Sequence, residues 1–252
     1  MRRVLGFYVA AVFAFLYVPL LILIGFSFNA SRTSLWSGFS LHWYGQIWRD
    51  PQLLEATTNS VVIALLSALL STVIGTAAAY GLWKKRARWF ATSLYLSLVT
   101  PEIVTGISLL VFFQYIFHWT HWHLGLYTVV LAHVAFSIAY VAIVVAARLR
   151  SFDAALEEAA LDLGATPWRA FWRVTLPFLW PGVLAAGLLA LIVSFDDYVI
   201  TSMVAGVDSE TLPMVIYALA RRGVNPTLNA ISALVVLLFG ALILLSERVR
   251  RA

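Results

Sequence analysis

Three carboxylic acids lie inside long apolar stretches of this 252-residue sequence. Glu102 is in one stretch, and the adjacent Asp196 and Asp197 are in another. A carboxylate at the centre of a membrane costs about 3 kcal/mol on insertion scales, so such acids normally face a polar cavity and mark functional sites. Neither stretch contains Lys or Arg. The acids therefore need a proton, water, another subunit or a cationic substrate as their partner.

Each acid also has a structural alternative. Glu102 follows Pro101, where it could satisfy backbone groups freed at a helix break. Either aspartate could instead bond to a partner subunit. Neighbours on a helix project about 100° apart, so only one aspartate can face a given path squarely. His133, in a third apolar stretch, is expected to form interhelical hydrogen bonds rather than to bind a ligand.

The composition places these acids in a membrane protein. Hydrophobic residues make up 62% of the chain and charged residues 12%, whereas a soluble domain has about 25% charged residues. A helix that crosses a membrane needs about 20 mostly apolar residues. We expect one all-α transmembrane domain over residues 1–252, with six spans at residues 7–28, 60–83, 92–117, 125–147, 182–204 and 228–246.

The Lys and Arg residues are divided unequally between the two sides of this predicted bundle. Thirteen of the 17 lie at the termini and in the second and fourth loops, and four lie on the other side. Cytoplasmic loops carry the excess of Lys and Arg, so we expect both termini of this multi-pass protein in the cytoplasm. The formal charge of +5 is then mainly a topology signal that also attracts anionic membrane lipid, and we expect no nucleic-acid partner.

Motifs for catalysis or metal binding are missing from the sequence. The chain has no cysteine, no His-Glu-x-x-His, no Gly-x-Ser-x-Gly and no phosphate-binding loop, so we expect no catalytic residue and no cofactor in it. His118, His121 and His123 lie together without a neighbouring carboxylate, and only the first two would share a helix face. We expect a polar turn at the membrane surface there, and no metal.

The outer segment, residues 29–59, contains a short amphipathic piece at residues 43–48 that begins at Trp43. Such a piece lies on the membrane surface or contacts a partner outside the membrane, and both readings remain open.

The inner segment, residues 148–181, predicts two short helices. Residues 151–164 are rich in Ala, Leu and Glu and end at Gly164, which can terminate a helix. Thr166 and Pro167 are suited to the cap and first position of a second helix, which we expect to end at Leu176-Pro177. The two helices would make a compact knob on the cytoplasmic side.

This inner segment also carries a family motif. Glu158-Ala159-Ala160, then Gly164 after three residues and Val174-Thr175-Leu176-Pro177 after nine more, resembles the EAA loop of permease subunits of ABC importers, with Val174 in place of Ile. In that family the loop forms the coupling helix that docks into a groove on the ATPase subunit. The resemblance implies a coupling role for Glu158, Ala159, Ala160, Gly164, Leu176 and Pro177.

Further motifs extend the resemblance over nearly the whole chain. The chain is similar to the second permease subunit of bacterial spermidine/putrescine importers in the motifs at residues 17–19, 27–29, 43–44, 101–106, 162–166, 194–197 and 223–226. The resemblance implies a type I ABC importer (MetI-like) permease fold in the bacterial inner membrane. It also implies ATP-driven, alternating-access transport of polyamines from periplasm to cytoplasm.

The resemblance further implies partners and a substrate path. The partners would be a homologous permease, two cytoplasmic ATPase subunits that bind ATP and Mg, and a periplasmic polyamine-binding protein. In the polyamine family, the residues that match Glu102, Asp196, Asp197 and Trp43 are implicated in substrate uptake. A polyamine, with ammonium groups separated by methylenes, fits acids that lack a counter-ion. Cation–π contacts to it are expected from Phe195, Tyr198 and Tyr115.

An ion-coupled secondary transporter of an organic cation is the alternative function. It would use the same acids as coupling sites, but six spans without convincing inverted repeats disfavour it.

Overall fold

The computed structural model describes residues 2–31, 35–85, 88–223 and 226–251. Regular structure in these ranges is helical, apart from one isolated bridge between Asn29 and Phe39. Arg86, one of the cytoplasmic cations, and Val224 and Asn225 of the last motif lie outside the described residues. The longer helices are α1 (Arg2–Phe26), α3 (Pro51–Lys85), α4 (Arg88–Val99), α5 (Glu102–Thr120), α6 (Leu126–Leu149), α9 (Leu176–Asp196) and α12 (Pro226–Arg251). The shorter ones are α2 (His42–Ile47), α7 (Ala154–Asp162), α8 (Pro167–Ala170), the π-helical η1 (Phe171–Thr175), α10 (Val199–Val204) and α11 (Leu212–Arg221).

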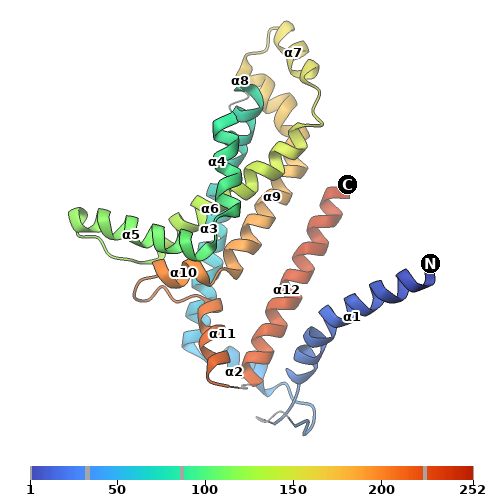
Figure 1. Cartoon of the computed structure of the whole chain (residues 1–252), viewed down its shortest axis with the longest axis vertical. Helices are drawn as coiled ribbons and strands as arrows, with labels where there is room; N and C mark the ends of the chain where they lie inside the picture. The colour runs from blue at the N-terminus through green and yellow to red at the C-terminus, as the bar shows by residue number, and fades with distance from the viewer. Residues whose placement is uncertain (1, 32–34, 86–87, 224–225, 252) are drawn as a thin grey trace.

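Helices α3, α6 and α9 pack together at the centre of the molecule (Figure 1). Small residues allow them to approach closely. A Cβ on Gly75 of α3 would lie 2.7 Å from the Cβ of Val141 in α6, and a Cβ on Gly187 of α9 would lie 3.0 Å from the Oγ1 of Thr72 in α3. Close van der Waals packing at small residues is what holds helices together inside a membrane, where lipid is as apolar as the side chains.

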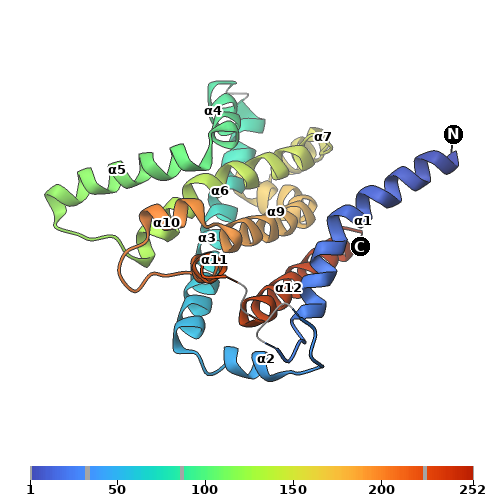
Figure 2. The same ribbon diagram turned by 60° about the horizontal axis from the view of Figure 1, so that its bottom comes forward.

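Helices α1 and α12 stand to one side of this centre and approach each other near α2 (Figures 1 and 2). Apolar side chains on α1 are exposed along its length; Phe7 is 78% and Phe15 80% exposed. An apolar surface that extends along a whole helix is typical of a membrane or protein contact surface rather than one that faces water.

Five of the described helical segments are long and apolar enough to cross a membrane, namely Leu5–Phe26, Pro51–Lys85, Glu102–Thr120, Leu126–Leu149 and Pro167–Asp196. Helix α12 covers the sixth expected span, and its described apolar part, residues 226–241, is shorter. Helix α3 begins at Pro51, well before residue 60, because Asp50 caps it through the N–H of Gln52 (Oδ1···N 3.0 Å).

Two of the expected spans are not single helices. The span expected at residues 92–117 is divided at Thr100-Pro101 into α4 and α5, and α5 runs across the direction of α4 (Figures 1 and 2). Pro101 has no N–H and disfavours helical geometry at the residue before it. The span expected at 182–204 is divided at Asp197-Tyr198 into α9 and α10. There the Asp197 carboxylate accepts a hydrogen bond from the N–H of Thr201 (2.8 Å) and starts a new helix. Hydropathy is continuous across both points and gives no sign of the breaks.

Candidate functional site

The two helix breaks lie next to each other. Helix α5, which follows the first break, packs along α10, which follows the second. Gly106 of α5 is buried in this contact; a Cβ there would lie 2.7 Å from the Sδ of Met203 and 3.4 Å from the Cα of Ile200 in α10. The small residue allows the helices to approach and so keeps the breaks together.

A cavity of about 350 Å³ lies between the breaks, and all three intramembrane acids line it. The structure therefore brings Glu102 together with Asp196 and Asp197, although they come from distant parts of the sequence. The remaining lining residues are Ser97, Leu98, Thr100, Thr105, Phe136, Tyr140, Ile192, Val193, Tyr198, Val199 and Ile200.

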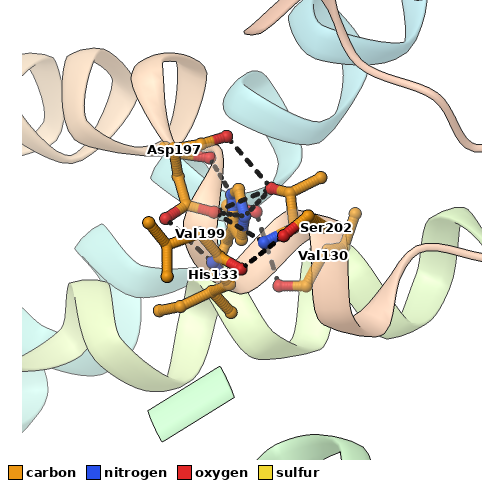
Figure 3. Close-up of polar contacts among 9 residues, drawn as sticks. Val130, His133, Asp197, Val199 and Ser202 are labelled. Carbon is orange, nitrogen blue, oxygen red and sulfur yellow. Dashed lines mark hydrogen bonds and ion pairs between the residues drawn. The ribbon is translucent and has the colours of Figure 1, made fainter. Parts of the chain in front are cut away.

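Asp197 is held by polar groups of its own chain. Its Oδ2 lies 3.3 Å from Nε2 of His133 in α6 and accepts hydrogen bonds from the hydroxyl and the N–H of Thr201, each at 2.8 Å. Its Oδ1 accepts the N–H of Ile200 at 3.4 Å. Figure 3 shows Asp197 facing His133 across the start of α10. The side chains of Asp197 and His133 are 5% and 1% exposed, so this cluster joins α6 to the α9–α10 break.

His133 is fully used in this cluster. Its Nδ1 lies 2.7 Å from the Oγ of Ser194 in α9, and its Nε2 lies 2.9 Å from the Oγ1 of Thr201. The expectation that His133 is an interhelical hydrogen-bonding residue is confirmed.

Asp196 and Glu102 differ from Asp197. Both are exposed, and within the described part of the chain neither forms an ion pair or a side-chain hydrogen bond. Since both line the cavity, they are the carboxylates left available for a cation from outside the chain. Of the two adjacent aspartates, the structure thus leaves Asp196 open to the cavity and ties Asp197 into the helix junction.

The aromatic residues of the cavity differ in part from the expected ones. Tyr198 lines it, but Phe195 is buried against Phe239 with ring centroids 5.1 Å apart, and Tyr115 is exposed outside the lining. Phe136 and Tyr140 of α6 occupy the lining instead. They follow His133 at helical spacing on one face of α6, which is a signal that the sequence does contain.

Trp43 is not among the residues that line this cavity. Its side chain is 4% exposed and packs with Ile47 and Leu53, and its Nε1–H donates to the carbonyl of Asn29 at 2.7 Å. In this conformation Trp43 fixes α2 to the segment that follows α1. A place for Trp43 in the substrate path stays a prediction.

The knob, residues 154–170 with α7 and α8, projects at one end of the molecule (Figure 1). Asp153 caps α7 through the N–H of Ala155 (3.0 Å). At its other end, the N–H of Ala165 donates to the Ala160 carbonyl (3.0 Å) and that of Gly164 to the Leu161 carbonyl (2.9 Å). These are the two bonds of a Schellman motif, and Gly164 supplies the positive φ of +83° that the motif requires. The expected end of the first helix at Gly164 is confirmed.

The second helix of the knob starts as expected but does not end as expected. The Thr166 hydroxyl accepts the N–H of Arg169 (3.3 Å), and Pro167 is the first helical residue. The chain then continues through η1 into α9, so the expected end at Leu176-Pro177 is wrong. Pro177 directly follows η1 in this continuous helical segment, where its missing N–H removes one backbone hydrogen bond. The inner segment is therefore a loop only as far as Thr166.

The motif residues of the knob lie largely on its surface. Glu158, Ala159 and Gly164 are exposed, Ala160 is half-buried, and the neighbouring Leu163 and Trp168 are 90% and 68% exposed. Leu176 and Pro177 lie at the start of α9, half-buried and exposed respectively. The knob thus presents an apolar surface with acidic residues beside it.

One acidic residue of α7, Glu157, is buried and carries a network that the sequence did not predict. It is 2% exposed and pairs with Nζ of Lys84, at the end of α3, at 2.8 Å. Hydroxyls of Tyr80 and Thr175 donate to it at 2.8 and 3.2 Å. Burial raises the pKa of the Glu157 carboxyl, but these hydrogen bonds and the Lys84 charge outweigh burial and hold the pKa below its usual value.

Comparisons with known proteins agree with these features. Residues 71–252 match the family described as binding-protein-dependent transport system inner membrane component. The chain is 42% identical over 230 residues to the putrescine transport system permease protein PotI of Escherichia coli K12, covering 88% of this chain and 82% of the relative. It is 37% identical over 244 residues to the spermidine/putrescine transport system permease protein PotC of Haemophilus influenzae, covering 95% and 93% of the two chains.

Solved structures show the same fold. A chain of a bacterial ABC transporter involved in the import of alginate, an acidic polysaccharide, superposes with a TM-score of 0.76 at 16% identity over 99% of this chain and 94% of that one. A chain of the MetNI methionine ABC transporter gives 0.67 at 19% identity over 82% and 97%. The all-α, MetI-like polytopic fold is thereby confirmed. The chain belongs to the family of binding-protein-dependent transport system inner membrane components, as a permease rather than an ATPase.

Proposed function

We propose that this chain is the transmembrane permease subunit of an ATP-driven importer that moves putrescine or spermidine from the periplasm to the cytoplasm. The observation that carries the proposal is the cavity at the two helix breaks, where Glu102 and Asp196 have no cation from their own chain among the described residues. The names of the relatives point to the same cargo. The fold alone does not, because the same fold occurs in an importer of an acidic polysaccharide.

The chemistry of the cavity suits a polyamine. Ammonium groups can pair with Glu102 and Asp196, while the methylenes between them lie against Tyr140, Tyr198 and Phe136. A cation over an aromatic face gains about 0.5–2 kcal/mol. A site in a transport path must bind weakly enough to release, so a few exposed acids in an open cavity fit better than a closed cage.

The complex that we propose contains a homologous permease, two cytoplasmic ATPase subunits and a periplasmic polyamine-binding protein. ATP and Mg would be held by the ATPase subunits. The knob, with Glu158, Ala159, Ala160 and Gly164 on or near its surface and Leu176 and Pro177 at its base, would dock on an ATPase subunit. The excess of Lys and Arg at the termini and inner loops supports a cytoplasmic position for both termini.

ATP-dependent uptake into proteoliposomes that contain the complete complex tests this proposal. Radiolabelled putrescine and spermidine are supplied with the binding protein, and Glu102→Gln and Asp196→Asn are compared with the unmodified chain. Each variant is expected to lower uptake at least about tenfold, because a hydrogen bond to a charged group contributes roughly 1.5–3 kcal/mol. Asp208→Asn is the matched control, since Asp208 is exposed on another loop and Asn tolerates its positive φ of 60°.

Three results would contradict the proposal. Unchanged uptake in both cavity variants would remove Glu102 and Asp196 from the substrate path. Uptake driven by an ion gradient in the absence of ATP would favour the secondary transporter. An equal loss in Asp208→Asn would show that any lost carboxylate impairs the complex.

A further inference from the structure

Glu157 is a buried carboxylate that neither the substrate path nor the exposed docking surface of the knob uses. Its three partners among the described residues come from two other elements. Tyr80 and Lys84 are one turn apart at the end of α3, and Thr175 is the last residue of η1, directly before α9. Glu157 therefore connects the knob to two of the three central helices at a single side chain.

The carboxylate is fully occupied by these contacts. Oε1 accepts the Tyr80 hydroxyl and the Lys84 ammonium, each at 2.8 Å, and Oε2 accepts the Thr175 hydroxyl at 3.2 Å. Glu157 and Thr175 are 2% and 0% exposed, whereas the Lys84 side chain is 42% exposed. Each oxygen thus points to a different element, Oε1 to α3 and Oε2 to the base of α9.

Aromatic pairs also join the end of α3 to the segments before and after the knob. The ring of Tyr80 lies 4.8 Å from that of Phe171 in η1, and Trp83 lies 5.8 Å from Phe152, which precedes α7. These contacts leave little room for the knob to move without moving the ends of α3 and α9. The π-helical turn at η1 is a type of irregularity found often at functional sites.

The base of α9 is mechanically connected to the cavity. The helical segment from Pro167 to Asp196 runs without interruption from the knob to the second helix break. Thr175 precedes the first residue of α9 and Asp196 is its last, which at 1.5 Å per residue separates them by about 30 Å along one continuous helix that contains Pro181. This continuous backbone is the route by which a displacement at Thr175 would reach the acid that lines the cavity.

We propose that Glu157 is a positioning residue that latches the knob to α3 and α9, so that movement of the docked knob is transmitted to the cavity. Pure stabilisation explains the network less well, because the cost of burying the Glu157 carboxylate offsets much of what its ion pair with the partly exposed Lys84 contributes. Because Oε1 binds α3 and Oε2 binds Thr175 before α9, the carboxylate fixes the position of the knob relative to both helices. A coupling element requires such a fixed position. The inference rests on the proposed function.

The test is the amount of putrescine moved per ATP hydrolysed by the reconstituted complex. Glu157→Gln keeps the shape of the side chain but loses the charge. Lys84→Gln removes the positive charge beside Oε1, and Tyr80→Phe removes the hydroxyl donor to Oε1. We expect each variant to retain the ATPase subunits during purification and to lower putrescine moved per ATP, by about fivefold in Glu157→Gln, within the range of coupling energies between linked sites. Lys85→Gln is the matched control, because Lys85 is the exposed neighbour of Lys84 on the same helix end.

The double variant Glu157→Gln/Lys84→Gln should be no worse than Glu157→Gln alone, since both residues belong to one interaction. If uptake and ATP hydrolysis fall together and their ratio stays unchanged, the network is only structural and the inference is wrong. If Glu157→Gln fails to accumulate, Lys84→Gln and Tyr80→Phe decide the question by the same ratio. If the unmodified complex shows no ATP-dependent uptake, the proposed function fails instead.

Discussion

The carboxylates near the two ends of helix α9 differ in whether the chain itself supplies their partners. Near the start of α9, Glu157 is buried, and within the described part of the chain its carboxylate is bound by Lys84, Tyr80 and Thr175. At its far end Asp196 is exposed in a cavity and has no hydrogen-bonding or ionic partner among the described residues. An acid that its own chain satisfies holds structure, whereas an acid left unsatisfied in a membrane is available to an outside cation.

Location alone does not separate these two roles, because Asp197 follows Asp196 directly and yet belongs with Glu157. Its carboxylate is occupied by His133, Thr201 and the N–H of Ile200. The distinction therefore depends on pairing, which three-dimensional structure decides and hydropathy does not.

The largest effect that this distinction predicts is a loss of stability in Asp197→Ala. The change leaves His133 and the first N–H groups of α10 without their acceptor, and each buried polar group left unpaired costs about 1–3 kcal/mol. We expect lower accumulation in the membrane and a lower temperature of aggregation in detergent, measured by size-exclusion chromatography after heating.

Asp196→Ala is the matched comparison for this prediction. It should leave stability within about 0.5 kcal/mol of the unmodified chain, as at an exposed site without partners, while uptake is lost. Equal destabilisation by both changes would remove the distinction between paired and unpaired acids.

The sequence predicted some of these features because their causes are local. The end of α7 follows from Gly164, whose role is set by its immediate neighbours. Glu102 and Asp196 were identifiable because acids are rare in apolar stretches. By contrast, the Glu157 network depends on Tyr80, which is 77 residues away, and on packing among three elements. The helix breaks depend on backbone hydrogen bonding, which an average hydropathy does not register.

A smaller effect is expected from Gly164→Ala, which alters the knob without touching the Glu157 network. The positive φ of +83° costs a non-glycine residue about 1–2 kcal/mol, and no atom lies within 4 Å of the new Cβ, so the cost is backbone strain alone. Binding of the ATPase subunit, measured by its recovery with the purified permease over a range of concentrations, should weaken by about 5- to 30-fold.

Gly81→Ala is the control for this change, because Gly81 also has open space around its Cβ but lies inside α3. Alanine in a helix interior is favoured over glycine by about 1 kcal/mol, so this variant should bind the ATPase normally. If Gly164→Ala also binds normally, the shape of the knob does not set the docking affinity.

The smallest effect concerns pH and the Glu157 network at the start of α9. The pKa of Glu157 is held below its usual value, because the contacts from Lys84, Tyr80 and Thr175 outweigh burial. A group whose pKa is lowered on folding stabilises the folded state above its unfolded pKa, about 4.3 for Glu, and loses that contribution as the pH falls through its folded value.

The chain has no cysteine, so a spin label on Ala155→Cys reports the mobility of α7 alone. Its spectrum should stay constant from about pH 8 to pH 5 and show greater mobility in more acidic solution. Glu157→Gln retains the capping Asp153 and should lack the part of this change that belongs to Glu157; the same acid response in both chains would show that Asp153, not the latch, holds α7 in place.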